Sequence, residues 1–117
     1  MEICFEGIGQ MVATFATKEE LASGMAVTLK ESGTVELGKE NGSPLCGVTV
    51  GAARSGAVAV QIGGVVKVSC PKDDGVPKVG WQQLVCDDQG RVKTTDGADG
   101  ANCLVLAADG ESVVIKL

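Results

Sequence analysis

The stretch Ala57-Val58-Ala59-Val60-Gln61-Ile62-Gly63-Gly64-Val65-Val66-Lys67-Val68-Ser69-Cys70 decides the fold class of this chain. Its larger apolar side chains recur at every second position on both sides of a glycine pair. Period-two alternation is typical of a half-buried β-strand, because successive side chains of a strand point to opposite faces. The pair Gly63-Gly64 is either a two-residue hairpin turn or a kink in one long strand, and we prefer the kink.

The same alternation continues along the rest of the chain. Glycine makes up 17 of 117 residues, about twice its usual share, and the glycines separate short runs of Val, Thr and Ile. The polar segments 30–33 and 87–90 each end in glycine and predict hairpin turns. One short helix is predicted at 17–23, where Thr17 and Glu20 form a capping box. The other strand candidates are 11–16, 25–30, 34–37, 46–52, 82–87, 91–95, 103–107 and 113–117.

An internal repeat organises these strands. Gly33-Thr34-Val35 and Gly90-Arg91-Val92 lie 57 residues apart, as do Cys46-Gly47-Val48 and Cys103-Leu104-Val105. We therefore expect an all-β protein, a small β-barrel or β-sandwich of roughly 8–10 short strands. The repeat units span roughly 24–70 and 80–117, and chance matching in a sequence rich in Val and Gly is the alternative. Residues 17–117 form a single β domain, and residues 1–16 an N-terminal arm or edge strand.

Composition excludes several classes of function. The chain has no histidine, which removes Ser-His-Asp and Cys-His catalysis and every metal site that contains histidine. A net charge of −5 and only three aromatic residues argue against nucleic-acid binding. We expect no membrane span, since no run approaches about 18 apolar residues. We also expect no secretory signal, because the first residues include no basic region.

The motifs that could indicate ligand binding or catalysis each depart from the pattern that this chemistry requires. The segment 33–40 matches a phosphate-binding loop except at its last position, where Glu40 replaces the hydroxyl residue that ligates Mg²⁺. The acidic clusters at 73–75 and 96–100 do not have the ligand spacing of a calcium loop and indicate turns. We therefore expect no enzyme activity, no metal and no cofactor.

Five cysteines, Cys4, Cys46, Cys70, Cys86 and Cys103, include no C-x-x-C pair. An odd number without a signal sequence suits free thiols in a reducing compartment. We interpret them as small core residues.

Surface contacts are then the remaining kind of function, and five residues are interface candidates: Ile3, Phe5, Ile8, Phe15 and Trp81. The first four lie in the N-terminal segment, which either contacts a neighbouring protomer or another protein, or adds a strand to its own barrel. We expect Trp81 to plug one end of the core, and the alternative is that it anchors a subunit contact.

Several segments together resemble a known family. They are Cys46-Gly47-Val48, 56–68, Val79-Gly80-Trp81-Gln82-Gln83-Leu84-Val85 and Asp88-Gln89-Gly90-Arg91-Val92, with the opening 7–15 and the ending 103–115. In this order they resemble small phage and prophage proteins that are encoded among head genes and regarded as capsid decoration or head-fibre-like proteins. The resemblance covers nearly the whole chain and rests on Gly and Val patterning.

The resemblance implies a non-enzymatic phage or prophage virion protein that binds the outer capsid surface and decorates or stabilises the head. It implies the major capsid protein as partner and a homo-oligomer, such as the trimers of lambdoid head-decoration proteins. It also implies synthesis in the bacterial host cytoplasm before assembly onto the virion. The alternative is a non-catalytic β-barrel accessory domain that binds another protein or a surface glycan.

We predict that all five cysteines are reduced in the folded protein, because neither their spacing nor the N-terminal sequence points to disulfides. Alkylation under denaturing conditions without reductant, followed by mass measurement, should add five labels. A deficit of two labels would mean a disulfide and would contradict the prediction.

Overall fold

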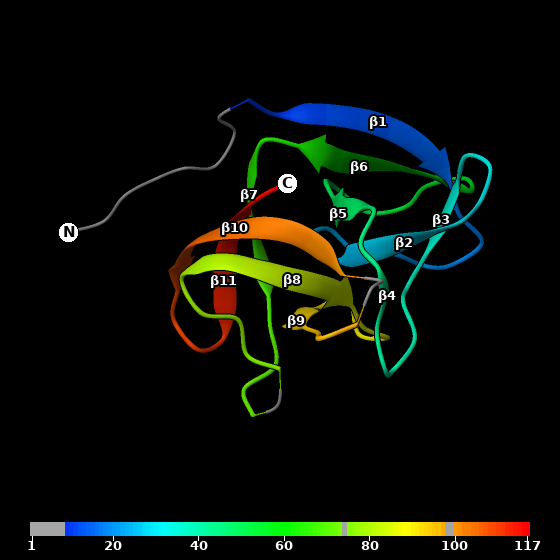
Figure 1. Cartoon of the computed structure of the whole chain (residues 1–117). Helices are drawn as coiled ribbons and strands as arrows, with labels where there is room; N and C mark the ends of the chain where they lie inside the picture. The colour runs from blue at the N-terminus through cyan, green and yellow to red at the C-terminus, as the bar shows by residue number, and fades with distance from the viewer. Residues whose placement is uncertain (1–8, 74, 98–99) are drawn as a thin grey trace.

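Two β-sheets share the chain in the computed structural model, which describes residues 9–73, 75–97 and 100–117 (Figure 1). Sheet A is a closed barrel with the strand order β1-β3-β2-β5-β6, and sheet B has the order β4-β8-β10-β11-β7 with β9 paired to β8. The described strands are β1 Met11–Ala16, β2 Ala26–Glu31, β3 Thr34–Glu36, β4 Ser43–Pro44, β5 Gly47–Thr49, β6 Ala57–Gly63, β7 Val65–Ser69, β8 Gly80–Cys86, β9 Val92–Thr94, β10 Ala101–Ala108 and β11 Ser112–Lys116. The predicted all-β fold is confirmed.

The corner at Gly63 and Gly64 joins the two sheets. β6 belongs to the barrel and β7 to sheet B, and the two strands do not pair with each other. Gly64 has a φ of 87°, a conformation that favours glycine, and a Cβ on Gly63 would lie 3.1 Å from the Cβ of Met11. The preferred kink is confirmed, and the alternative of a hairpin turn is wrong.

The strand β1 closes the barrel. It pairs antiparallel with β6 from Met11↔Gly63 to Ala16↔Ala57, and parallel with β3 at Ala16↔Thr34. Residues 11–16 therefore add a strand to their own barrel, which is one of the two alternatives for the N-terminal segment. Residues 1–8 lie outside the described part of the chain.

The two sheets have the same order of pairing. In the barrel, β6 lies between β1 and β5, and β2 lies between β5 and β3. In sheet B, β11 lies between β7 and β10, and β8 lies between β10 and β9. By this order, β1 of the barrel corresponds to β7 of sheet B. The strand β1 lies outside both repeat units that the sequence predicts, 24–70 and 80–117, and yet it belongs to the barrel. The 57-residue sequence repeat itself stays a prediction.

Two clusters of buried side chains form the core. One lies inside the barrel and includes Val27, Val35, Val58 and Val60, with half-buried Phe15 packed against it. The other joins the sheets and combines barrel residues with residues of sheet B: Ala26, Val48, Val68, Cys70, Leu84, Cys86, Val92, Cys103, Val105, Val113 and Ile115. Burial of these apolar side chains is the main favourable term for both sheets.

The helix predicted at 17–23 is wrong. This segment forms bends and turns between β1 and β2. The Thr17 hydroxyl oxygen accepts a hydrogen bond from the amide of Glu19 (3.1 Å), and the Glu19 carboxylate accepts one from the amide of Leu37 (3.1 Å). The threonine therefore closes a local turn, while Glu19 bonds a residue that is distant in sequence. Within the described ranges, there is no helix that is long and apolar enough to cross a membrane.

The turn at 87–90 holds the two sheets together. The carboxylate of Asp87, which is only 2% exposed, accepts hydrogen bonds from the amides of Gln89 and Arg91 (both 2.9 Å) and from Arg91 Nε (2.8 Å). The same turn reaches the barrel, because Gly90 O accepts from Ala26 N (2.8 Å). As predicted, this turn joins the hairpin β8–β9, and the turn at 30–33 joins the hairpin β2–β3.

We predict that Asp87→Ala lowers the free energy of unfolding by about 1–3 kcal/mol, because it removes a buried carboxylate that accepts hydrogen bonds from Gln89 and Arg91. The exposed neighbour supplies a matched control: Asp88→Ala should change stability by less than about 0.5 kcal/mol. Urea unfolding of both variants measures the difference, and equal midpoints would contradict the role of this turn.

Candidate interaction surface

An apolar surface lies on the side of sheet B that faces away from the core, and we call it the outer face. Trp81 on β8 is 62% exposed, and its cross-strand neighbour on β10 is half-buried Leu104. The next residue in this row is Lys116 on β11, and Val114 on the same strand lies opposite Lys67 on β7. These five residues define the outer face.

The orientation of the outer face follows from strand alternation. On β11 the side chains of Val113 and Ile115 are buried, so Val114 and Lys116 point the other way. On β8 the core takes Leu84 and, two residues later, Cys86, which leaves Trp81 on the opposite side. The sequence alternative in which Trp81 plugs the core is therefore wrong.

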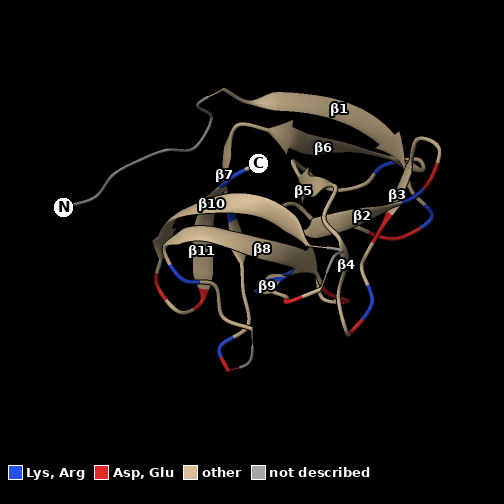
Figure 2. Cartoon of the chain, in the orientation of Figure 1, with Lys and Arg blue, Asp and Glu red and all other residues tan. Residues whose placement is uncertain are grey.

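The charges of the outer face differ from those of the whole chain. The chain has a net charge of −5, yet the outer face carries Lys67 and Lys116, and neither forms an ion pair within the described residues. β8 and β10 carry no charged residue, and Figure 2 shows them without blue or red. Val79, 65% exposed, precedes β8 and adds apolar area near Trp81. The result is an apolar patch with a basic border on an acidic protein.

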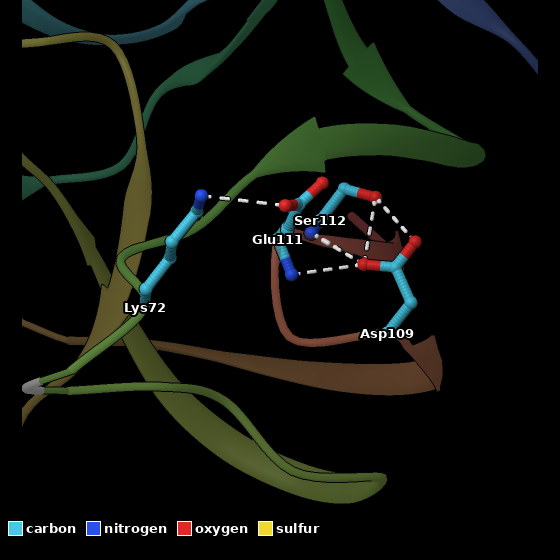
Figure 3. Close-up of polar contacts among 4 residues, drawn as sticks. All are labelled: Lys72, Asp109, Glu111 and Ser112. Carbon is cyan, nitrogen blue, oxygen red and sulfur yellow. Dashed lines mark hydrogen bonds and ion pairs between the residues drawn. The ribbon is translucent and has the colours of Figure 1, made fainter.

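The turn between β10 and β11 is fixed by Asp109 (Figure 3). Its Oδ1 accepts hydrogen bonds from the amides of Glu111 (2.9 Å) and Ser112 (2.8 Å). These two bonds lower the pKa of the Asp109 carboxyl, and the hydroxyl of Ser112 and the charge of Lys67 act in the same direction. Lys72 Nζ lies 3.3 Å from Glu111 Oε1 beside the turn. Asp109 thus holds the hairpin whose two strands carry Leu104 and Val114.

A hollow of about 400 Å³ lies beside β7. Residues of β5 and β7 line it, together with Gln10 and Gln61. Gln61 is buried, and its Nε2 donates to Gly63 O (3.0 Å) and Val65 O (3.2 Å) while its Oε1 accepts from Gln10 Nε2 (3.4 Å). Both side-chain ends of this glutamine are therefore engaged within the protein.

The described thiols belong to the core. Cys46, Cys70, Cys86 and Cys103 are free, and Cys4 lies outside the described residues. Burial raises the pKa of all four described thiols, that of Cys86 to about 12. A thiol with a raised pKa is a poor nucleophile and a poor metal ligand. In the described part of the chain, no group of three or more Cys, Asp or Glu side chains is placed to hold a metal ion.

The loop that resembles a phosphate-binding motif serves packing instead. Gly33 ends the β2–β3 turn with a φ of 69°. A Cβ on Gly38 would lie 2.4 Å from the carbonyl oxygen of Cys86, so glycine is needed for the close approach of this loop to β8. Neither glycine leads into a helix.

The structure places the predicted interface residues in three different settings. Trp81 is exposed on the outer face, Phe15 packs on the barrel core, and Ile3, Phe5 and Ile8 lie outside the described residues. Sequence reasoning missed the other residues of the outer face, namely Leu104, Val114, Lys67 and Lys116, and the exposed Val79 that precedes β8. The signal was present, because the alternation that buries Val113 and Ile115 turns Val114 and Lys116 outward.

The fold of this chain is similar to that of a solved structure. The match is titled "The crystal structure of head fiber gp8.5 N base in bacteriophage phi29". The TM-score is 0.60 at 17% sequence identity, and the match covers 92% of this chain and 93% of that chain. No family model matches, and no curated protein matches. The head-fibre-like resemblance is confirmed at the level of the fold.

We predict that Asp109 titrates below its ordinary pKa of 3.8, because the folded turn bonds the ionised form. The turn's contribution to stability is then present above that ordinary value and is lost as the pH falls through the lowered pKa. NMR titration of the Glu111 and Ser112 amides measures the midpoint, and Asp109→Asn should remove the inflection. A midpoint at 3.8 or above would contradict the prediction.

Proposed function

We propose that this chain is a non-enzymatic structural protein of a phage or prophage virion, which binds the outer surface of the capsid and decorates or stabilises the head. The fold supports this proposal, because nearly the full length of the chain matches a phage head-fibre base. A likeness of fold does not by itself assign a role. The surface chemistry of the chain therefore has to supply the rest of the argument.

The observation that carries the proposal is the exposure of Trp81. It is the only tryptophan of the sequence, it is 62% exposed, and it lies beside Leu104 and near Val79. Tryptophan is enriched among the residues that dominate binding energy at protein interfaces. Burying its ring against a partner would contribute on the order of 2–3 kcal/mol from the hydrophobic effect alone.

The charges of the outer face suggest how the partner is oriented. Lys67 and Lys116 border the apolar centre, and both are exposed. Basic groups at an interface rim affect the rate and the orientation of association more than its final affinity. We propose the major capsid protein as the partner, with an apolar recess for Trp81 and acidic residues around it. The protein would be made in the host cytoplasm and act as a homo-oligomer on the capsid surface.

Trp81→Ala should weaken binding to the capsids of the phage that encodes the chain by on the order of tenfold or more, since it removes the proposed anchor. Co-sedimentation of the purified protein with expanded capsids measures the change. The fold should persist, because an exposed ring contributes little to the core.

Met11→Ala is the matched control, because Met11 is 60% exposed but lies on the barrel. It should bind capsids as the unaltered protein does. Equal binding by both variants would contradict the role of the outer face. Binding of the unaltered protein to a glycan array but not to capsids would favour the accessory-domain alternative.

A further inference from the structure

The loop between β3 and β4 contains the one Asn-Gly pair of the sequence, Asn41-Gly42. Asn41 is exposed, and the pair lies in a turn in which Gly42 N donates a hydrogen bond to Lys39 O (2.9 Å). Gly42 has a φ of 104°, a conformation that side-chain-bearing residues rarely adopt. Asparagine and glycine are residues that turns favour, so the pair has a conformational role here.

The same pair is chemically reactive. The main-chain nitrogen that follows an asparagine can attack the side-chain carbonyl carbon, and a following glycine hinders that attack least because it has no Cβ. At this site a bond forms between Gly42 N and Asn41 Cγ. The bond from Cγ to Nδ2 breaks, and ammonia leaves with the proton of the Gly42 amide. Water then opens the cyclic imide at either of its carbonyls, which yields aspartate or isoaspartate at position 41.

The folded turn opposes the first step of this reaction. Gly42 N has to lose its proton before it attacks, and in the closed turn that proton is donated to Lys39 O. Gly42 is also held against β8, because a Cβ at this position would lie 2.5 Å from Val85 Cγ2. Reaction at Asn41 therefore requires the turn to open locally.

Two further hydrogen bonds hold the turn closed. Lys39 N donates to Ser43 Oγ (2.9 Å), and Lys93 Nζ on β9 donates to Glu40 O (2.7 Å). The carbon stem of Lys93 reaches the same place, since its Cε would lie 3.6 Å from a Cβ on Gly42. The frequency of opening thus depends on two side chains that lie outside the Asn-Gly pair.

The other asparagine of the sequence lies in a different setting. Asn102 is inside β10, where it is paired with Gln83 of β8. The residue that follows it is Cys103, which is buried and has a Cβ to hinder the attack. Asn102 therefore serves as an internal comparison for Asn41 in the same protein.

An isoaspartate at position 41 does not fit the closed turn. It routes the main chain through the side chain, which inserts a methylene group before Gly42, and it adds a negative charge beside Glu40. Gly42 packs so closely on Val85 that there is no room for an additional carbon atom. The strand β4 begins at the next residue, where Ser43 pairs with Cys86, so its pairing with β8 is the first contact affected.

We propose that Asn41 is a site of spontaneous deamidation, that the closed turn protects it, and that isoaspartate formation there loosens the pairing of β4 with β8. The carbonyl carbon of Asn41 is the electrophile, Gly42 N is the nucleophile and water is the second reactant. This inference does not rest on the proposed capsid binding, and its experiments use the free protein.

Peptide mass measurement after incubation at mildly alkaline pH follows the reaction at each asparagine. Deamidation of Asn41 should be on the order of tenfold or more faster in guanidinium chloride than in the folded protein, because opening is then no longer required. Asn102 should stay unmodified in the folded protein. Equal rates at Asn41 in both conditions would overturn the protection, and no reaction at Asn41 in either condition would overturn the site.

Two variants test the bonds that close the turn. Lys93→Met keeps the carbon stem and removes the ammonium group, and Ser43→Ala removes the acceptor for Lys39 N. Each should speed deamidation of Asn41 by about two- to tenfold while circular dichroism shows an unchanged fold. Lys39→Met is the matched control, because among the described residues Lys39 bonds only through its main chain. Unchanged rates in both test variants would overturn the role of these bonds.

Urea unfolding tests the consequence of the modification. The isoaspartate form, separated by chromatography, should unfold at a lower urea concentration than Asn41→Asp, which carries the same charge without the additional methylene group. Equal midpoints would overturn the proposed loosening of β4. Capsid binding is measured separately through Trp81→Ala, so either proposal can fail alone.

Discussion

One bent strand serves both sheets, and the architecture depends on that bend. At Gly63 and Gly64 the chain leaves the barrel and enters sheet B. The alternation of buried positions shifts just before the corner, because Val60 and Gln61 are both buried while Ile62 is exposed. A side chain at Gly63 would crowd Met11, and Gly64 takes a backbone conformation that L-residues rarely adopt. Without the bend, β6 and β7 would extend a single sheet, and the core cluster that combines residues of both sheets would not form.

A second constraint fixes how the sheets meet. Asp87 is buried, and its carboxylate organises the turn whose Gly90 carbonyl bonds the first residue of β2. Gly38 of the barrel side also donates to Asp87 O (3.1 Å), so the turn is bonded to two separate segments of the first half. A charged group in this position costs desolvation energy, which the hydrogen bonds and the Arg91 guanidinium offset.

The same arrangement explains why Trp81 is exposed on sheet B. The barrel uses β1 to close its edge and points Phe15 at its own core. Among the described residues, sheet B has no further strand beyond β7 and is covered on one face, so Trp81 and Leu104 are left on the other. A unit with one closed barrel and one open sheet is suited to contacts with other proteins. Such contact is the role that we propose, and the likeness of fold to a phage head-fibre base supports it.

The sequence by itself determined every described strand except β4, the two polar hairpin turns and the corner, because alternation and glycine placement act over a few residues. The tertiary structure decided which strands meet, since β1 pairs with β6 at sequence separations of 41 to 52 residues. The expected helix at 17–23 does not form, because the Glu19 carboxylate accepts a hydrogen bond from the distant amide of Leu37. Trp81 points away from the core, because Leu84 and Cys86 occupy the core side of β8. The local alternation of side chains predicts that a strand has two faces. Only packing against residues distant in sequence decides which of the two faces is buried.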